Sequence, residues 1–246
     1  VMFLWNVIGT AGQPKLYSVY KAFIVSSAAW LSLTALIGIL LAIHLRYPFI
    51  PKSHLEILKL HAHAGLAGWF LQLIIGISSR LVPMFLLGKS TKHHLLRNAL
   101  WLQNLALVLF LIDGYFNGTS IRYLLYGGCV VAGIIFWLLY LGDVYRHRLK
   151  KKMDFPMRHT LVSFISLLTA VILLPVLYIS VQAKWAIIYG LFLFLGWISS
   201  IVLGMTFKTL PFIVWNNRYK QLNGIVKIPL PKQLYSETLL RFQFWL

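Results

Sequence analysis

The stretch LEILKLHAHAGLAGWFLQLIIGISS, residues Leu55–Ser79, decides the fold of this chain. Its only charged side chains, Glu56 and Lys59, stand close to its start. A helix that crosses a lipid bilayer needs about 20 largely apolar residues. The stretch therefore predicts a membrane-spanning helix.

Similar apolar segments lie on both sides of this one, each bounded by polar, glycine or proline residues. The six predicted spans are Tyr17–His44, Leu55–Ser79, Leu95–Phe116, Ile121–Gly142, Thr160–Ser180 and Lys184–Phe207. Only helices and closed barrels satisfy every backbone group in lipid. The segments are too long and too uniformly apolar for barrel strands, which alternate over about ten residues. We predict an all-α fold, a polytopic membrane helix bundle of six transmembrane helices.

The composition supports the same class of protein. Apolar residues make up 59% of the chain and charged residues 11%, whereas soluble domains have about 25% charged residues. Disordered chains are polar and poor in aromatics, so disorder is excluded as well. The lone cysteine, Cys129, rules out an intrachain disulfide and a CxxC site. The chain opens on Val1, and we expect it to be part of a longer polypeptide.

The basic residues are sorted by membrane side. Six spans place the N-terminus, the second and fourth loops and the C-terminal tail together, and this side carries 18 of the 23 lysines and arginines. The positive-inside rule assigns that side to the cytoplasm. The net charge of +18 is then a topology signal suited to anionic lipid headgroups. We therefore expect both termini in the cytoplasm and no nucleic-acid partner.

The tail is predicted to be separate from the six-helix transmembrane domain of residues 1–210. Residues 211–246 are interrupted by prolines and basic residues, and they do not form a seventh span. Lys232–Leu246 carries apolar residues at helical spacing, which indicates a short helix on the cytoplasmic interface. A partly ordered tail packed on neighbouring subunits is an equal alternative. The sequence shows no evident internal repeat.

Two histidines are the leading candidates for chemistry, because ionisable residues at membrane depth are costly and ask for a reason. His61 and His63 stand in the run HAHAGLAGW, residues 61–69. Residues i and i+2 of a helix point about 200° apart, so the pair cannot easily chelate one metal. Each can serve a different cofactor, and the small residues around them admit a neighbouring helix or a flat macrocycle. The alternative is two interfacial histidines bonded to backbone or water beside a packing seam.

This run resembles a known motif. HAHAGLAGW, followed by Gly76 and by RLVP at residues 80–83, is similar to the tenth transmembrane helix of the heme-copper oxidase catalytic subunit, most closely the cbb-type branch. The stretch GMTFKTLPFIVW, residues 204–215, resembles shorter bacterial proteins that are like oxidase subunit I. The resemblance implies that His61 is the proximal ligand of a high-spin heme and that His63 ligates a low-spin heme. It also implies a bacterial cytoplasmic membrane.

The resemblance covers the later helices of that family only. The family's copper ligands and its other low-spin heme ligand lie on earlier helices that this chain lacks. Copper is therefore not supported by these residues. Other membrane subunits, or helices preceding Val1, are the partners that the resemblance implies.

Other polar residues are weaker candidates. His44 ends the first span near the depth of His61, so it either completes an axial pair or caps the helix at the interface. Gln72, Gln103 and Asn104 lie inside spans, where we expect interhelical hydrogen bonds or a polar lining.

These observations predict a heme-binding membrane protein that takes part in respiratory electron transfer or in oxygen or nitric oxide chemistry. One alternative is a membrane heme protein without turnover, which acts in nitric-oxide response or cofactor handling. Another is a cofactor-free structural subunit of a membrane complex.

Overall fold

The structure is a computed structural model that describes residues 2–11, 18–118, 120–180 and 182–245. Helices dominate these residues, and none of them belongs to a β-strand. Within the described part of the chain, six helices are long and apolar enough to cross a membrane: Val19–Arg46, His54–Leu86, His93–Phe116, Arg122–Arg146, Phe155–Leu177 and Ala183–Arg218. The predicted all-α polytopic bundle is thereby confirmed, and each predicted span corresponds to one of these helices, except that Tyr17 at the start of the first span lies outside the described residues.

The second span is built from three segments that follow one another without a break. These are α3 (His54–His63), the π-helix η1 (Ala64–Leu71) and α4 (Gln72–Leu86). Ser53 begins the helix with a capping box: its hydroxyl accepts from the Glu56 N–H, and the Glu56 carboxylate accepts from the Ser53 N–H.

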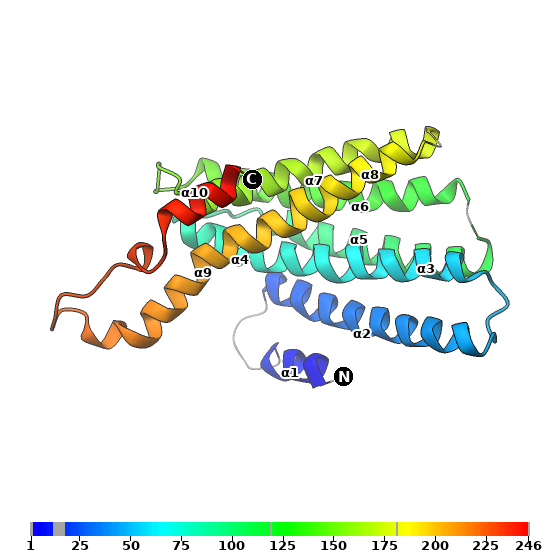
Figure 1. Ribbon diagram of the computed structural model, residues 1–246, viewed down its shortest axis with the longest axis horizontal. Coiled ribbons are helices and arrows are strands. Elements are labelled where there is room, and N and C mark those ends of the chain that lie inside the picture. The colour runs from blue at the N-terminus through cyan, green and yellow to red at the C-terminus, as the bar shows by residue number, and fades with distance from the viewer. Residues whose placement is uncertain (1, 12–17, 119, 181, 246) are drawn as a thin grey trace. The chain divides into compact units, whose positions relative to one another are not determined.

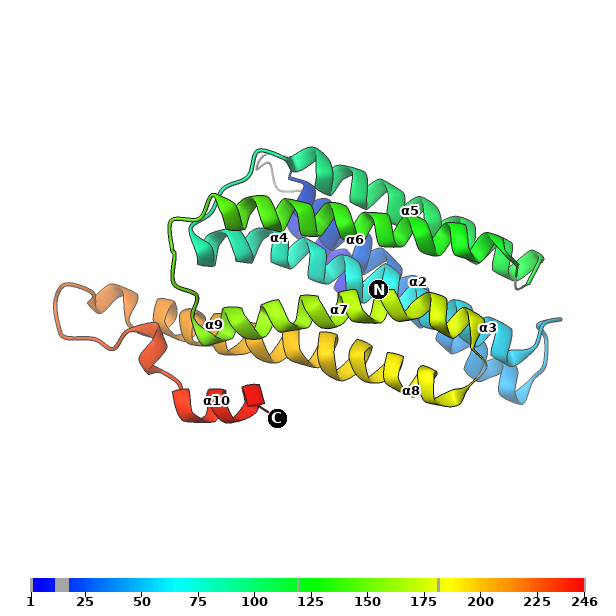
Figure 2. The same cartoon turned by 90° about the horizontal axis from the view of Figure 1, so that it is seen from above.

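The chain forms two compact units, of which the first is Val1–Lys151. It holds a short apolar helix, α1 (Met2–Ala11), and the spans α2 (Val19–Arg46), α3–α4, α5 (His93–Phe116) and α6 (Arg122–Arg146). Within it, α2 packs along η1 and α4, and α5 packs along α6 (Figures 1 and 2). Trp30, Ala64 and Leu107 bring α2, η1 and α5 together in a buried cluster.

The second unit is Lys152–Leu246. Its first span is α7 (Phe155–Ile179), which packs along α8 (Ala183–Leu191), the π-helix η2 (Phe192–Ser199) and α9 (Ser200–Arg218). Helix α9 continues through Pro211 to Arg218, so the first residues of the expected tail are helical. Proline is tolerated in membrane helices because local adjustments and neighbouring groups satisfy the freed carbonyl.

The rest of the tail returns to the start of α7. Short 3₁₀ turns at Lys220–Leu222 and Pro231–Gln233 lead to α10 (Glu237–Trp245). The Phe244 ring lies 5.8 Å from the Phe155 ring and 5.5 Å from the His159 ring. A helix in the region Lys232–Leu246 is therefore present, and it begins at Glu237.

Candidate functional site

His61 and His63 lie in the last turn of α3, directly before the π-helix η1. The capping box at Ser53 sets where α3 begins. The two rings contact different helices, as their spacing predicts. His63 faces α5, and His61 faces α2.

The His63 imidazole is held in one orientation. Its Nδ1 lies 2.8 Å from the Lys59 carbonyl oxygen, so Nδ1 carries the proton and donates it. The Phe110 ring of α5 lies beside it, with 5.0 Å between ring centroids. A neutral imidazole in this tautomer carries its lone pair on Nε2, and the side chain is exposed. A backbone carbonyl that fixes the ring in this way is the usual outer partner of a metal-binding histidine.

The His61 imidazole packs on α2 at Gly38. A Cβ atom placed on Gly38 would lie 3.0 Å from the His61 Cε1 atom. The His61 Nδ1 is buried and has no hydrogen-bond partner among the described residues. An unsatisfied buried polar atom costs about 1–3 kcal/mol, and the described residues offer the His61 Nδ1 no partner that offsets this cost.

The small residues that follow the histidines pack against α2. A Cβ on Gly65 would meet Thr34 at 3.3 Å, and one on Gly68 would meet Trp30 at 2.7 Å. This side of the helix therefore accommodates a neighbouring helix, which is one of the two possibilities that the sequence left open.

His44 does not join His61 or His63. Its Nδ1 accepts from the Phe49 N–H at 3.1 Å and from the Ile50 N–H at 3.3 Å, and its ring stacks on His54 at 6.3 Å. His44 thus holds the turn that follows α2. Its interactions are those of a cap, whereas its expected role as an axial ligand has no support in this geometry.

A second polar cluster lies where α5 meets α6, at the end of unit 1 where α3 begins. Asp113 is buried and pairs with Arg122 at 3.0 Å, and it accepts from the Asn117 amide at 2.6 Å. Its second oxygen has no partner among the residues that the structure describes. The contact with Arg122 explains why a buried acid is tolerated there.

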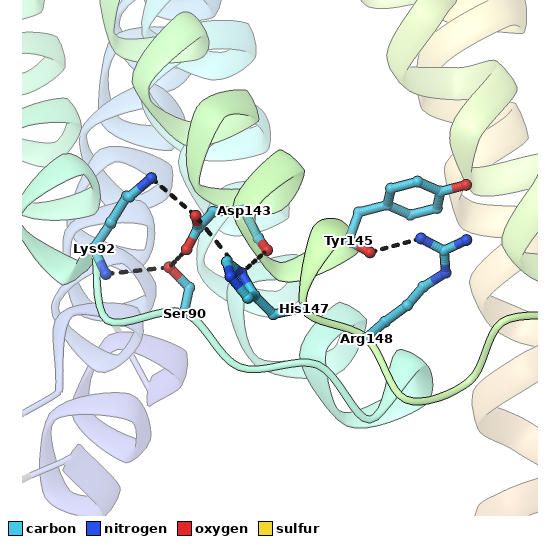
Figure 3. A network of polar contacts seen from close by, with 6 residues as sticks. All are labelled: Ser90, Lys92, Asp143, Tyr145, His147 and Arg148. Atoms are coloured by element: carbon cyan, nitrogen blue, oxygen red, sulfur yellow. Dashed lines mark hydrogen bonds and ion pairs between the residues drawn. The ribbon is translucent and has the colours of Figure 1, made fainter.

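The opposite end of unit 1 is closed by Asp143 (Figure 3). The Asp143 carboxylate accepts from the Ser90 hydroxyl at 2.7 Å, and it pairs with Lys92 at 2.9 Å and with His147 at 3.8 Å. Ser90 and Lys92 precede α5, whereas Asp143 and His147 lie at the end of α6. The network ties the connection between α4 and α5 to α6, and we read it as structural.

The three amides inside the spans behave differently from one another. The Asn104 side chain accepts from the Ser26 hydroxyl at 2.9 Å and from the Trp30 indole N–H at 2.7 Å. The expected interhelical hydrogen bonds are therefore confirmed for Asn104. Gln72 and Gln103 are fully buried, and neither amide has a partner within the described chain. Sequence spacing does not distinguish these two outcomes.

No group of three or more histidine, cysteine or acidic side chains is placed to hold a metal ion among the described residues. Single imidazoles such as His63 remain suited to bind iron axially.

Comparisons of the chain with protein-family models, with curated proteins and with solved structures give no match. The functional interpretation therefore depends on the geometry and on the motif in α3.

Proposed function

We propose that this membrane protein binds heme through axial imidazoles on α3, with His63 ligating one iron and His61 a second. The observation that carries the proposal is the exposed His63 ring, whose Nδ1 is hydrogen-bonded to the Lys59 carbonyl oxygen. Heme bound there would supply electron transfer or the binding of oxygen or nitric oxide. The chain would supply the ligand, its orientation and an apolar surrounding.

The geometry supports the two histidines unequally. His63 is exposed and correctly oriented, and Phe110 offers an aromatic surface beside it. His61 lies against α2 with a buried, unpartnered nitrogen. The resemblance to the oxidase motif is what assigns His61 to a separate heme. We therefore place the greater weight on His63.

The expected respiratory role follows from this resemblance. It implies a bacterial cytoplasmic membrane, with α3 beginning outside and other membrane subunits or helices completing the heme environment. The motif and the charge sorting support this orientation.

A cofactor-free structural subunit is the second candidate function. It is favoured by one observation: α2 fills the space over Gly65 and Gly68 that a macrocycle would need on that side. The two candidates differ in whether the purified protein contains heme.

The test is the heme content and absorption spectrum of the protein purified from its native membrane. We expect His63→Ala to remove a six-coordinate low-spin signal, because the variant lacks the oriented Nε2 ligand. His61→Ala should alter a separate high-spin population. His94→Ala, in an exposed position at the start of α5, is the matched control. If both α3 variants keep the wild-type heme content and spectrum, the heme proposal is wrong.

A further inference from the structure

The second and sixth spans share a pattern of residues at identical spacing, with no insertion or deletion within it. Each residue of the pattern in the second span has a counterpart exactly 128 positions later. The pattern is Gly68, Trp69, Gly76, Arg80 and Pro83 in one span, and Gly196, Trp197, Gly204, Lys208 and Pro211 in the other.

The backbone follows the same offset. The π-helix η1 covers Ala64–Leu71 and the π-helix η2 covers Phe192–Ser199, so both boundaries also differ by 128 positions. π-Helices are rare, and among the described residues these two stand in the same place relative to the Gly-Trp pair.

The glycines of the second span pack against α2, the helix that precedes this span. A Cβ on Gly68 would lie 2.7 Å from the Trp30 ring, and a Cβ on Gly76 would lie 2.9 Å from the Phe23 Cβ. The glycines are eight residues apart, whereas Phe23 and Trp30 are seven apart on α2. A π-turn holds one residue more than an α-turn, which accounts for the difference.

The glycines of the sixth span are used in the same way. A Cβ on Gly196 would lie 2.8 Å from the Ser166 Cβ, and one on Gly204 would lie 3.1 Å from the His159 Cβ. Here too the glycines are eight residues apart and their partners on α7 are seven apart.

A buried hydroxyl marks the same register in α2 and α7. Ser27 and Ser163 are both buried. The Ser27 hydroxyl donates to the Ile24 carbonyl at 2.8 Å, and the Ser163 hydroxyl donates to the Thr160 carbonyl at 2.7 Å. These serines are 136 positions apart, as are Phe23 and His159. This offset is larger than 128 because the segment that connects the two packed helices is longer in the first hairpin than in the second.

We infer that the chain contains two copies of one two-helix packing module, a first hairpin of residues 19–86 and a second hairpin of residues 155–218. Residue spacing, π-helix position, glycine contacts and the buried serine all agree on one register. These shared features are the ones through which the two helices of each hairpin pack together.

The histidines are not among the shared features. The positions of His61 and His63 are occupied by Tyr189 and Leu191 in the second hairpin. The second hairpin therefore packs without imidazoles at these two positions, and a ligand bound by the first hairpin would account for the difference. This step rests on the proposed function, and it assigns heme binding to the first hairpin and a scaffold role to the second.

Cysteine crosslinking tests whether the two hairpins share a register. In a Cys129→Ser background, we expect oxidant to link Phe23→Cys with Gly76→Cys, and His159→Cys with Gly204→Cys, in nearly all molecules. The short Cβ separations given above place both pairs within disulfide reach after a small shift. Controls displaced by two residues, Val25→Cys with Gly76→Cys and Leu161→Cys with Gly204→Cys, should stay unlinked. Crosslinking in one hairpin alone, or at the displaced pairs, would overturn the shared register.

Thermal unfolding of alanine variants is a second test, which applies even if the cysteine variants fail to fold. Gly68→Ala and Gly196→Ala should each lower the melting temperature by about 5 °C. Gly142→Ala and Gly190→Ala, whose added Cβ would meet nothing within 4 Å, should not. Equal loss in all four variants contradicts the module.

Heme content separates this inference from the proposed function. The division of roles predicts that His63→Ala loses heme and that Leu191→Ala keeps it. Matching crosslinks together with the wild-type heme content and spectrum in both His61→Ala and His63→Ala would leave the duplicated module standing and refute the heme site. Loss of heme in Leu191→Ala would refute the division of roles.

Discussion

Neighbouring residues on α5 show how much the position of one amide matters. The Asn104 oxygen accepts two hydrogen bonds from α2, whereas both amide atoms of Gln103 are buried without a partner in the described chain. Gln103 packs on Gly133 of α6, where a Cβ would lie 2.7 Å from the Gln103 Cγ. One side chain joins two helices, and the other fills space at the cost of unsatisfied polar atoms.

This contrast predicts opposite effects on stability. Asn104→Leu should lower the free energy of unfolding by about 1–3 kcal/mol, because the Ser26 hydroxyl and the Trp30 N–H lose their acceptor. Gln103→Leu should be neutral or stabilising, because it removes buried polar atoms that have no partner. Thermal unfolding of the two variants in the same detergent provides the measurement. A comparable loss in Gln103→Leu would show that its amide does have a partner.

Among the elements, α10 carries apolar side chains on two faces. Leu240 and Phe244 face α7, while Leu239, Phe242 and Trp245 are exposed. Arg241 is exposed, and its guanidinium lies 5.2 Å from the Phe155 ring. An outward apolar face next to basic residues suits the boundary between lipid headgroups and acyl chains.

We therefore expect α10 to lie in the membrane interface. An environment-sensitive fluorophore attached at Phe242→Cys, in a Cys129→Ser background, should be quenched by nitroxide lipids in proteoliposomes that contain anionic lipid. The same fluorophore at Lys232→Cys, in an exposed position before α10, should respond to an aqueous quencher instead. Aqueous quenching at Phe242→Cys would show that this face is turned toward water.

For the whole molecule, the distribution of charge specifies orientation more directly than any single contact does. Eighteen basic residues lie on one predicted side of the six spans, and five lie on the other. The structure supplies the six apolar helices on which this count depends. The Asp143 network closes unit 1 on the side predicted to be cytoplasmic (Figure 3).

The orientation predicts the accessibility of exposed loop residues. In intact cells of a Cys129→Ser background, a membrane-impermeant thiol reagent should label Tyr47→Cys and should leave Lys151→Cys unlabelled. Lysis should expose Lys151→Cys. Labelling of Lys151→Cys without lysis would reverse the topology.

Sequence alone determined the class of fold, because long uninterrupted apolar segments have no stable form in lipid other than helices. It also placed His61 and His63 on opposite sides of one helix, since the angle between residues i and i+2 is a property of the helix itself. Tertiary structure decided which neighbour each imidazole meets, that His44 holds a turn, and that Gln72 and Gln103 lack the hydrogen bonds that Asn104 makes. It also revealed the duplicated hairpin, because a few glycines become a pattern only when their facing residues are known. Those contacts depend on how separate helices pack, which is a long-range property that periodicity along one segment does not contain.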